Sequence, residues 1–418
     1  MTYPSVTPPS STPAYCAGMD VGQHRPYRRS AASRTGGGLD PANDENQECR
    51  VKKMIRVAAL TGALALTLGA CASAPEEETP GAEGTAGSGS DFKACMVSDE
   101  GGFDDASFNQ SGFEGLERAE KELGIEIRSA ESSDPGQYTA NVDSMVQESC
   151  DLIIGVGFAL EDAIQAAAEA NPDLHFALVD SAFSGEDFAP VELENAKPLL
   201  FNTQEAAFLA GYLAAGYSKS GKVATFGGLN IPPVTVFMDG FADGVAHYNK
   251  TKSKNVQVLG WDKAKQNGTF AENFGDPNKG KALTSTFVAQ GADVILPVAG
   301  GTGLGAGDVA LASAGKVSVI WVDQDGCKNA EKYCEVFLTT VVKNIEDAVK
   351  TAVVTGAKGE KLEATPGYLG DLGNNGVSLA PYNKFDSKVD AGLKAEIDKL
   401  KADIVAGTIK VTSANAPK

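Results

Sequence analysis

Apolar and polar residues alternate in two different rhythms from residue 92 onward. Nine short runs rich in apolar and β-branched residues predict strands at 92–99, 125–130, 151–158, 174–180, 222–228, 255–261, 292–300, 317–323 and 335–343. Most segments between them place apolar residues at i, i+3 and i+4, and predict helices at 108–124, 137–149, 160–172, 205–221, 236–249, 278–291, 304–315 and 344–359. Near-continuous apolar strands joined by helices are typical of parallel sheets covered on both faces. The pattern therefore predicts a doubly wound α/β fold.

The number of strands favours two medium-sized sheets over one. The first set ends near Phe201, where a long helical segment begins, and the last helices are expected to cross a hinge between two lobes. The predicted N-terminal lobe comprises residues 91–202 and about 340–362, and the C-terminal lobe comprises 203–339 and about 363–418.

Polar residues or glycines end most of the predicted strands, in both halves of the chain. They are Asp99, Gly157, Asp180, Gly227, Gly228, Gly300, Gly301, Asp323 and Lys343. Ligands of open α/β sheets bind beyond the carboxyl ends of the strands. The pattern therefore predicts a ligand cleft between the two lobes.

The first ninety residues lack this periodicity. Residues 1–53 are rich in Ser, Thr, Pro, Gly and Arg, and 54–70 combine a basic start, a short apolar run and small residues before Cys71. This layout is typical of an export signal, since the apolar run is too short to span a bilayer. Residues 71–90 are polar and of low complexity, as in a flexible tether. We expect Met54 to be the translation start and 1–53 an upstream extension, because export signals are read at the N-terminus.

Composition narrows the classes of partner. The 418 residues carry 36 Lys and Arg against 55 Asp and Glu, a net charge of −19, and 42 % are apolar, as in a folded globular protein. The acidic excess argues against a nucleic acid partner, because phosphate backbones are bound by clustered Lys and Arg. The three histidines, His24, His175 and His247, give little support to a metal centre or a Ser-His-Asp relay, and we expect no metal.

Four cysteines lie within the predicted lobes. An exported protein meets oxidising conditions, so these cysteines are candidates for disulfides. Cys327 and Cys334 are seven residues apart in a polar loop and can close a small ring, whereas Cys95 and Cys150 can bridge if their strands are neighbours. A metal site is the alternative, and no Cys-x-x-Cys pair or nearby histidine supports it.

A glycine-rich segment at 298–308 follows a predicted strand and begins a helix, as a dinucleotide-binding loop does. Its glycines, Gly303, Gly305 and Gly307, depart from the usual spacing. We therefore favour close approach of the backbone to a small ligand, with a nicotinamide-dependent enzyme as the alternative. The chain has no Gly-x-Ser-x-Gly turn and no Walker loop, so no catalytic residue and no cofactor are predicted.

Acidic and aromatic residues are interleaved at 97–116 (VSDEGGFDDASFNQSGFEGL). Phe103, Phe108 and Phe113 stand among carboxylates such as Asp105. Aromatic rings beside hydrogen-bond acceptors suit a flat heterocycle that carries a sugar. We favour this interpretation over a metal site or a catalytic carboxylate pair.

Eight segments resemble, in order, the landmarks of the basic membrane lipoprotein family, the substrate-binding lipoproteins of ABC importers. They are the 97–116 segment, DLIIGVGF (151–158), FALVDS (176–181), FLAGYLAA (208–215), KVATFGGLNIPPVTVFMDGFADGV (222–245), FGDPNKGKAL (274–283), ADVILPVAGGTGLGA (292–306) and VIWVDQD (319–325). The resemblance covers about residues 92–380. It implies the type I periplasmic binding protein fold, in which two doubly wound lobes are joined by a hinge.

The resemblance also implies a set of ligand-binding residues. They are Asp99, Phe108, Asn109, Asp180, Phe274, Gly300, Asp323 and Lys343. Phe108 and Phe274 would stack on the two faces of a base, with Phe270 as a competitor of Phe274. Asp99 and Asn109 would bind the edge of the base. Asp180, Asp323 and Lys343 would hold the ribose hydroxyls, and Gly300 would allow close approach of the backbone.

The family's function follows from the same resemblance. It implies a receptor that closes on a purine or related nucleoside and passes it unchanged to a membrane permease with its ATPase, without enzyme activity. Leu68-Gly-Ala-Cys71 resembles a lipobox, which implies lipidation of Cys71 and anchoring of the exported protein on the outer face of the cell membrane. A pentose receptor of the same fold is the alternative. A nicotinamide-dependent enzyme is less favoured, because that cofactor is cytosolic.

Overall fold

The computed structural model describes residues 91–417, except 186–188, 361 and 363–366. The predicted extension, export signal and tether, with the lipidation site Cys71, lie outside the described residues. Within the described ranges, no helix combines the length and the apolar character that a membrane span requires.

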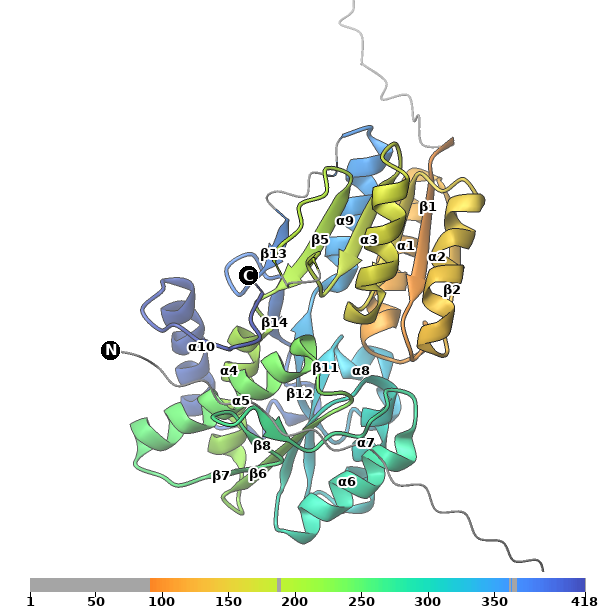
Figure 1. Cartoon of the computed structure of the whole chain (residues 1–418). Coiled ribbons are helices and arrows are strands. Elements are labelled where there is room, and N and C mark those ends of the chain that lie inside the picture. Colours follow the sequence, from red (N-terminus) through yellow and green to blue (C-terminus); the bar gives the residue numbers. More distant parts are fainter. Residues whose placement is uncertain (1–90, 186–188, 361, 363–366, 418) are drawn as a thin grey trace, which may run out of the picture. The chain divides into compact units, whose positions relative to one another are not determined.

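The first sheet has six parallel strands in the order β13-β5-β4-β3-β1-β2 (Figure 1). The strands are β1 (Lys93–Ser98), β2 (Glu126–Ala130), β3 (Leu152–Val156), β4 (His175–Val179), β5 (Ala196–Phe201) and β13 (Tyr368–Gly370). Helices α1 (Phe108–Leu123) and α9 (Ile345–Ala357) pack with one face, where Met96 lies in one core with Leu116 and Val349. Helices α2 (Tyr138–Gln147) and α3 (Glu161–Ala170) cover the other face, where Val97 lies in a separate core with Val142.

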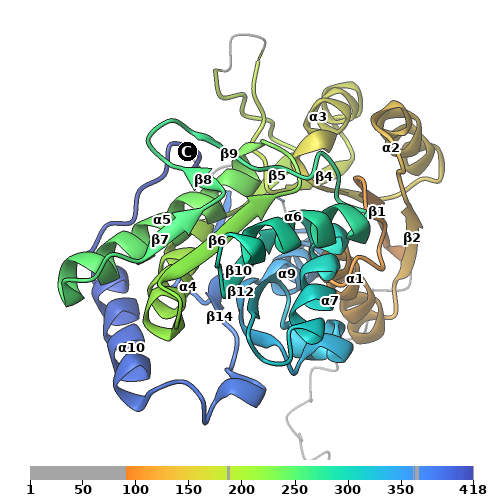
Figure 2. The ribbon, with the colours of Figure 1, turned by 90° about the horizontal axis from the view of Figure 1, so that it is seen from below.

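The second sheet repeats this plan, in the order β14-β12-β11-β10-β6-β7, and only β14 is antiparallel to its neighbour. Its strands are β6 (Lys222–Gly227), β7 (Gln257–Leu259), β10 (Val294–Val298), β11 (Ser318–Asp323), β12 (Phe337–Lys343) and β14 (Val377–Leu379). Its helices are α4 (Thr203–Tyr217), α5 (Pro232–Lys252), α6 (Pro277–Ala289), α7 (Leu304–Ala312), α8 (Gly326–Asn329) and α10 (Ala391–Val405). Helix α10 packs on α4, and a two-stranded ribbon, β8 (Trp261–Asp262) and β9 (Asn267–Gly268), follows β7 (Figure 2).

The two faces of the second sheet belong to different cores. Leu296 and Phe237 share the core that also contains α1 and α9, whereas Phe226 lies on the other face with Phe287 of α6 and Ala306 of α7. The first of these cores therefore runs from one sheet to the other along α4 and α5.

Three glycines let α4 and α5 approach each other closely. A Cβ on Gly211 would lie 2.0 Å from the carbonyl oxygen of Phe241, and one on Gly244 would lie 2.0 Å from that of Phe208. A Cβ on Gly240 would lie 2.3 Å from the carbonyl oxygen of Gln204. Since no side chain fits at these crossings, the glycines fix the position of α5, whose first turns enter the cleft described below.

The chain passes between the two sheets three times: after β5 into α4, after β12 into α9, and after β13 into β14. The doubly wound, two-sheet fold predicted from the sequence is confirmed. The pairings place 340–343 in the second sheet and 368–370 in the first, which differs from the expected lobe limits at those two points. The extent of each lobe as a folding unit stays a prediction.

Candidate functional site

A cleft lies where the carboxyl ends of the strands of both sheets meet. It encloses about 520 Å³, part of it open to solvent. The lining residues are Asp99, Glu100, Asp105, Phe108, Asn109, Gly157, Phe158, Asp180, Ile231, Pro233, Val234, Phe237, Phe274, Val298, Ala299, Gly300, Val322, Asp323 and Lys343. All eight residues implied by the family resemblance are among them. The structure thus brings the whole predicted set to one place, while the role of each residue stays a proposal.

One end of the cleft is built on β1 and the start of α1. The Asn109 side chain is 1 % exposed and donates from Nδ2 to Asp99 Oδ1 at 3.0 Å. Its own Oδ1 has no hydrogen-bond partner among the described residues. A buried amide oxygen without a donor costs free energy, and such an atom facing a cleft is suited to accept a hydrogen bond from a ligand.

Asp105 holds this end of the cleft in place. Its carboxylate accepts hydrogen bonds from the backbone N–H groups of Ser107, Asn109 and Gln110, at 2.9, 3.0 and 3.1 Å. These are donors at the N-terminus of α1 that have no partner within the helix. The sequence predicted Asp105 as one of the hydrogen-bond acceptors beside the aromatic rings, and its contacts show that it positions Phe108 and Asn109.

Desolvation controls the charge of the two carboxyl groups at this end. It raises the pKa of Asp99 to about 8, although the hydrogen bond from Asn109 opposes the shift. It also raises the pKa of Asp105, against the effect of the backbone donors. At neutral pH the Asp99 carboxyl group therefore retains its proton in most molecules and can act as a hydrogen-bond donor.

The other end of the cleft centres on the ammonium of Lys343, which is 2 % exposed. Lys343 Nζ forms an ion pair with Asp180 of the first lobe and lies 3.8 Å from Asp323 Oδ1 of its own sheet. Asp323 Oδ2 accepts a hydrogen bond from Ser107 Oγ at 2.6 Å. Desolvation raises the pKa of Asp323 to about 6 and also raises that of Asp180, while Lys343 opposes both shifts. The single ammonium of Lys343 is therefore shared by the carboxylates of Asp180 and Asp323. Carboxylate oxygen atoms remain available to a ligand.

Aromatic rings surround the ammonium. Its Nζ lies 5.1 Å from the ring centre of Phe108, 4.9 Å from that of Phe237 and 5.9 Å from that of Phe201. The faces of aromatic rings attract a cation at such distances. Sequence analysis missed Phe237, because a phenylalanine in an apolar helix has the pattern of an ordinary core residue.

The other phenylalanines considered from the sequence differ in whether they line the cleft. Phe274 lines the cleft. Phe270, its competitor, is not among the lining residues and packs edge-on against Trp261, with ring centres 6.2 Å apart. Phe103 and Phe113 also lie outside the lining and stack on each other at 4.6 Å. Of the three phenylalanines in the 97–116 segment, Phe108 is the one that reaches the cleft.

Unusual backbone conformations occur at the strand ends that line the cleft. Asp180 and Asp323, at equivalent positions after β4 and at the end of β11, both have φ of 67°. This left-handed conformation is strained for residues other than glycine and often marks functional sites. Gly157 has φ of 121°, and a Cβ there would lie 2.0 Å from Asp99 Oδ2, so only glycine fits beside that carboxyl group.

Hydrogen bonds between the lobes hold the cleft closed on one side. Trp321 Nε1 donates to the carbonyl of Ala106 at 3.2 Å. Glu114 of α1 accepts from Gln324 Nε2 at 2.9 Å and from Asn329 Nδ2 at 3.0 Å. Glu114 could not be predicted from the sequence, because its two partners in the second lobe lie more than 200 residues away.

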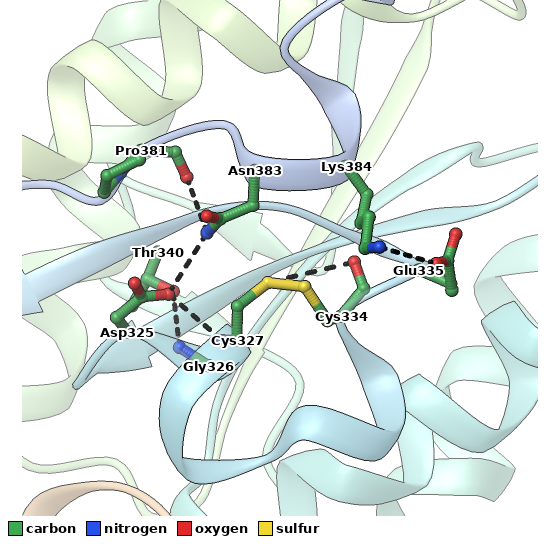
Figure 3. Close-up of a disulfide and its surroundings, with 9 residues drawn as sticks. All are labelled: Asp325, Gly326, Cys327, Cys334, Glu335, Thr340, Pro381, Asn383 and Lys384. Carbon is green, nitrogen blue, oxygen red and sulfur yellow. Dashed lines mark hydrogen bonds and ion pairs between the residues drawn. A yellow bond between two sulfur atoms is a disulfide. The ribbon is translucent and has the colours of Figure 1, made fainter.

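Both candidate disulfides are present. Cys95 of β1 is joined to Cys150, two residues before the start of the neighbouring β3, with Cα atoms 5.9 Å apart. Cys327 and Cys334, with Cα atoms 4.6 Å apart, close the loop that contains Asn329 (Figure 3). Thr340 Oγ1 accepts a hydrogen bond from the backbone N–H of Gly326 at 3.1 Å, which ties the start of this loop to β12.

In the described part of the chain, no group of three His, Cys, Asp or Glu residues is arranged to hold a metal ion.

Two parallel-sheet lobes, joined by three crossings and meeting over a cleft at the strand ends, are the architecture of the type I periplasmic binding protein fold. A solved ABC transporter solute-binding protein from Aeropyrum pernix K1 is similar, with a TM-score of 0.67, 23 % identity, and coverage of 76 % of this chain and 92 % of that one. This likeness supports the fold alone.

The family follows from sequence comparison. The family model described as ABC transporter substrate-binding protein, PnrA-like, matches residues 92–414. The ABC transporter nucleoside-binding protein BmpA of Lactococcus lactis subsp. cremoris is 31 % identical over 378 residues, 87 % of this chain and 99 % of that protein. Basic membrane protein A of Borreliella burgdorferi is 28 % identical over 327 residues, 78 % of this chain and 89 % of that protein. The chain belongs to the Bmp family of ABC transporter substrate-binding proteins, which confirms the resemblance found in the sequence.

The raised pKa of Asp99 predicts a pH-dependent effect of Asp99→Asn on stability. Between pH 4, where an unfolded aspartate titrates, and about 8, the folded protein holds a proton that the unfolded chain has released. The free energy of unfolding contributed by Asp99 therefore falls as the pH rises, and asparagine removes this loss. In urea denaturation without ligand, the free energy of unfolding of Asp99→Asn should rise relative to that of the wild type by at most about 1.4 kcal/mol per pH unit.

Asp104→Asn is the matched control for this experiment, since Asp104 is an exposed carboxylate on the same loop. The difference in free energy of unfolding between Asp104→Asn and the wild type should not grow as the pH rises. A difference between Asp99→Asn and wild type that stays constant from pH 4 to 8 would contradict the raised pKa.

Proposed function

We propose that the cleft binds a purine or related nucleoside, with the base at the Asp99–Asn109 end and the ribose at the Lys343 end. The observation that carries the proposal is the presence, in one cleft, of two chemically different polar ends with phenylalanines lining the space between. A base needs stacking surfaces and a donor–acceptor pair at its edge, whereas a ribose diol needs acceptors for its hydroxyl hydrogens. A pentose alone would leave the first set of groups without a partner.

The base end offers complementary groups. The protonated Asp99 carboxyl group can donate to a ring nitrogen or an exocyclic oxygen, and Asn109 Oδ1 can accept from an N–H group. Phe108 and Phe274 provide apolar surfaces beside this edge. Stacking of a base on aromatic rings contributes about 1–3 kcal/mol per base.

The ribose end offers two carboxylates and one ammonium. A diol can donate one hydrogen to each of Asp180 and Asp323 and accept from Lys343. Five carboxyl side chains but a single ammonium occur among the described lining residues. A phosphorylated nucleoside would add negative charge to an already acidic site, so the proposal is for a nucleoside and not a nucleotide.

Transport follows from the family's class. We infer that the two lobes close over the nucleoside and that a membrane permease with its ATPase accepts the closed form. The protein would be exported and held at the outer face of the cell membrane by a lipid on Cys71, with 71–90 as its tether. The nucleoside-binding name of the Lactococcus lactis relative supports the ligand class.

A ligand panel tests this function directly. Thermal unfolding of the purified protein should shift upward with one or more of inosine, guanosine and adenosine, and not with ribose or NAD. At 100 times its dissociation constant, a ligand should stabilise the folded protein by about 2.7 kcal/mol. Stabilisation by a pentose without any response to the three nucleosides would reject the proposal in favour of a sugar receptor. A response to NAD alone would favour the nicotinamide alternative.

Replacing the stacking ring is a second test. Phe108→Ala should weaken nucleoside binding by roughly 1–3 kcal/mol, about five- to 150-fold, as measured by isothermal titration calorimetry. Phe113→Ala, on the same helix but outside the cleft, is the matched control and should leave the affinity close to that of the wild type. Equal affinities for Phe108→Ala and wild type, with the fold intact, would remove Phe108 from the binding site.

The anchor is tested by fractionation of cells that produce the full chain. The wild type should be in the membrane fraction and carry a lipid at Cys71, because two or more acyl chains are enough for stable attachment. Cys71→Ser should lose the lipid and leave the membrane, and Ala72→Ser, the same new side chain at the next residue, should behave as wild type. Recovery of mature protein that retains any of residues 1–53 would contradict the predicted start at Met54.

A further inference from the structure

A second pocket adjoins the cleft and encloses about 830 Å³, part of it open to solvent. Phe158, Asp180 and Pro233 line both pockets. The cleft follows the carboxyl ends of β1, β3 and β4, and the second pocket continues along the same sheet edge to β5, where Leu200 and Phe201 line it. The two pockets therefore form one continuous path along the first sheet.

The order of strands gives this path a direction. Asp99 follows β1, Asp180 follows β4, and β3 lies between these two strands. Neighbouring strands are about 4.8 Å apart. The second pocket therefore lies on the far side of Asp180 from Asp99, and in the proposed binding mode it opens from the sugar end of the ligand.

The wall of the second pocket is mainly apolar. It includes Phe158, Ala182, Phe183, Phe201, Val236 and Ala416. Two serines on this wall have their hydroxyl hydrogens engaged elsewhere, because Ser181 and Ser184 both donate to the carboxylate of Glu161, each at 2.5 Å. The pocket can therefore bury apolar surface but offers few free donors.

The C-terminal segment forms one side of the pocket and is held in place by specific contacts. Ser413 Oγ donates to Asp239 Oδ2 of α5 at 2.6 Å, and Asp239 is fully buried. Asn415 Nδ2 donates to Gln266 Oε1 at 2.6 Å, and Lys263 Nζ donates to the carbonyl of Thr412 at 2.5 Å. These contacts position Ala416 as a fixed wall opposite the loop after β4.

The charges around this pocket disfavour an anion. None of the described residues that line it is Lys, Arg or His. The one carboxylate it shares with the cleft, that of Asp180, is already paired with Lys343. A phosphate group would be desolvated there without a counter-charge, which is costly, whereas a neutral apolar group would gain from burial.

We propose that the second pocket is a subsite for a neutral, apolar substituent on the sugar of the ligand. This inference rests on the proposed nucleoside function. The protein then binds two classes of nucleoside, the parent compounds and derivatives in which a sugar hydroxyl is replaced by a small uncharged group such as an alkylthio group. Phosphorylated derivatives are excluded from both classes.

Calorimetric titration of the purified protein tests the subsite with four nucleosides and one nucleotide. Adenosine and inosine are each compared with their 5′-deoxy-5′-methylthio derivatives, and adenosine 5′-monophosphate is added as the anionic probe. For whichever base binds, the methylthio derivative should bind within about tenfold of the parent, a difference of no more than about 1.4 kcal/mol. The monophosphate should bind at least about a hundredfold more weakly than adenosine, or not at all.

Two variants fill the pocket from opposite sides. Ala182→Phe and Ala416→Phe should each weaken binding of the methylthio derivative by about tenfold or more, because the added ring occupies the space of the substituent, and change binding of the parent by less than about threefold. Both alanines are partly exposed, so each ring can be accommodated in the folded protein. Ala395→Phe, on an exposed position of α10, is the matched control and should change neither affinity.

The outcomes separate the subsite from the function on which it rests. Binding of a parent nucleoside with no binding of its methylthio derivative would overturn the subsite and leave the nucleoside function standing. Equal loss of both ligands in the two filling variants would also overturn it. If no nucleoside binds at all, the nucleoside function fails, and the subsite fails with it.

Discussion

The ammonium of Lys343 is the group on which the arrangement of the cleft depends. A buried cation costs several kcal/mol in lost hydration unless anionic partners replace the water. Lys343 ends a strand of the second sheet, and its ion-pair partner Asp180 follows a strand of the first, so this ion pair forms only while the lobes lie close together. Asp323, 3.8 Å away, completes the charge arrangement and is itself held by Ser107 of the first lobe. The proposed binding mode therefore uses the same atoms that hold the two lobes together.

The strand ends convert this charge arrangement into a shaped site. Asp180 and Asp323 adopt the same left-handed conformation at equivalent positions of the two sheets, which turns both carboxylates toward one ammonium. Such a conformation costs of order 1–3 kcal/mol for a residue other than glycine and persists only where surrounding packing enforces it. Helix α5 also contributes to this end of the cleft, since the ring centre of Phe237 lies 4.9 Å from Lys343 Nζ. The position of α5 in turn depends on its close backbone approach to α4 at Gly211 and Gly244.

The sequence predicted most of the architecture, because long strands and helices carry a clear apolar period. It missed the strands β13 and β14, which have three residues each, and the ribbon strands β8 and β9, which have two, because such short strands show no period. It also predicted no helix at α10. The cleft residues were found through strand ends and motif order, and all eight line the cleft. Glu114, whose partners in the second lobe lie far along the chain, could not be found in this way. Helix geometry separates two rings of the 97–116 segment, since Phe108 and Phe113 are five residues apart, about 140° around a helix, and face different sides.

The three crossings between the sheets have a consequence for synthesis. The first sheet receives its last strand at Tyr368–Gly370 and the second at Val377–Leu379, although their other strands are built from residue 93 onward. Neither sheet can reach its full set of strands until nearly the whole chain has left the ribosome. Contacts between such distant residues also form slowly, because a long loop must close before they are made. The nascent chain therefore stays incompletely folded through most of its synthesis, which is the condition that threading through a membrane channel requires.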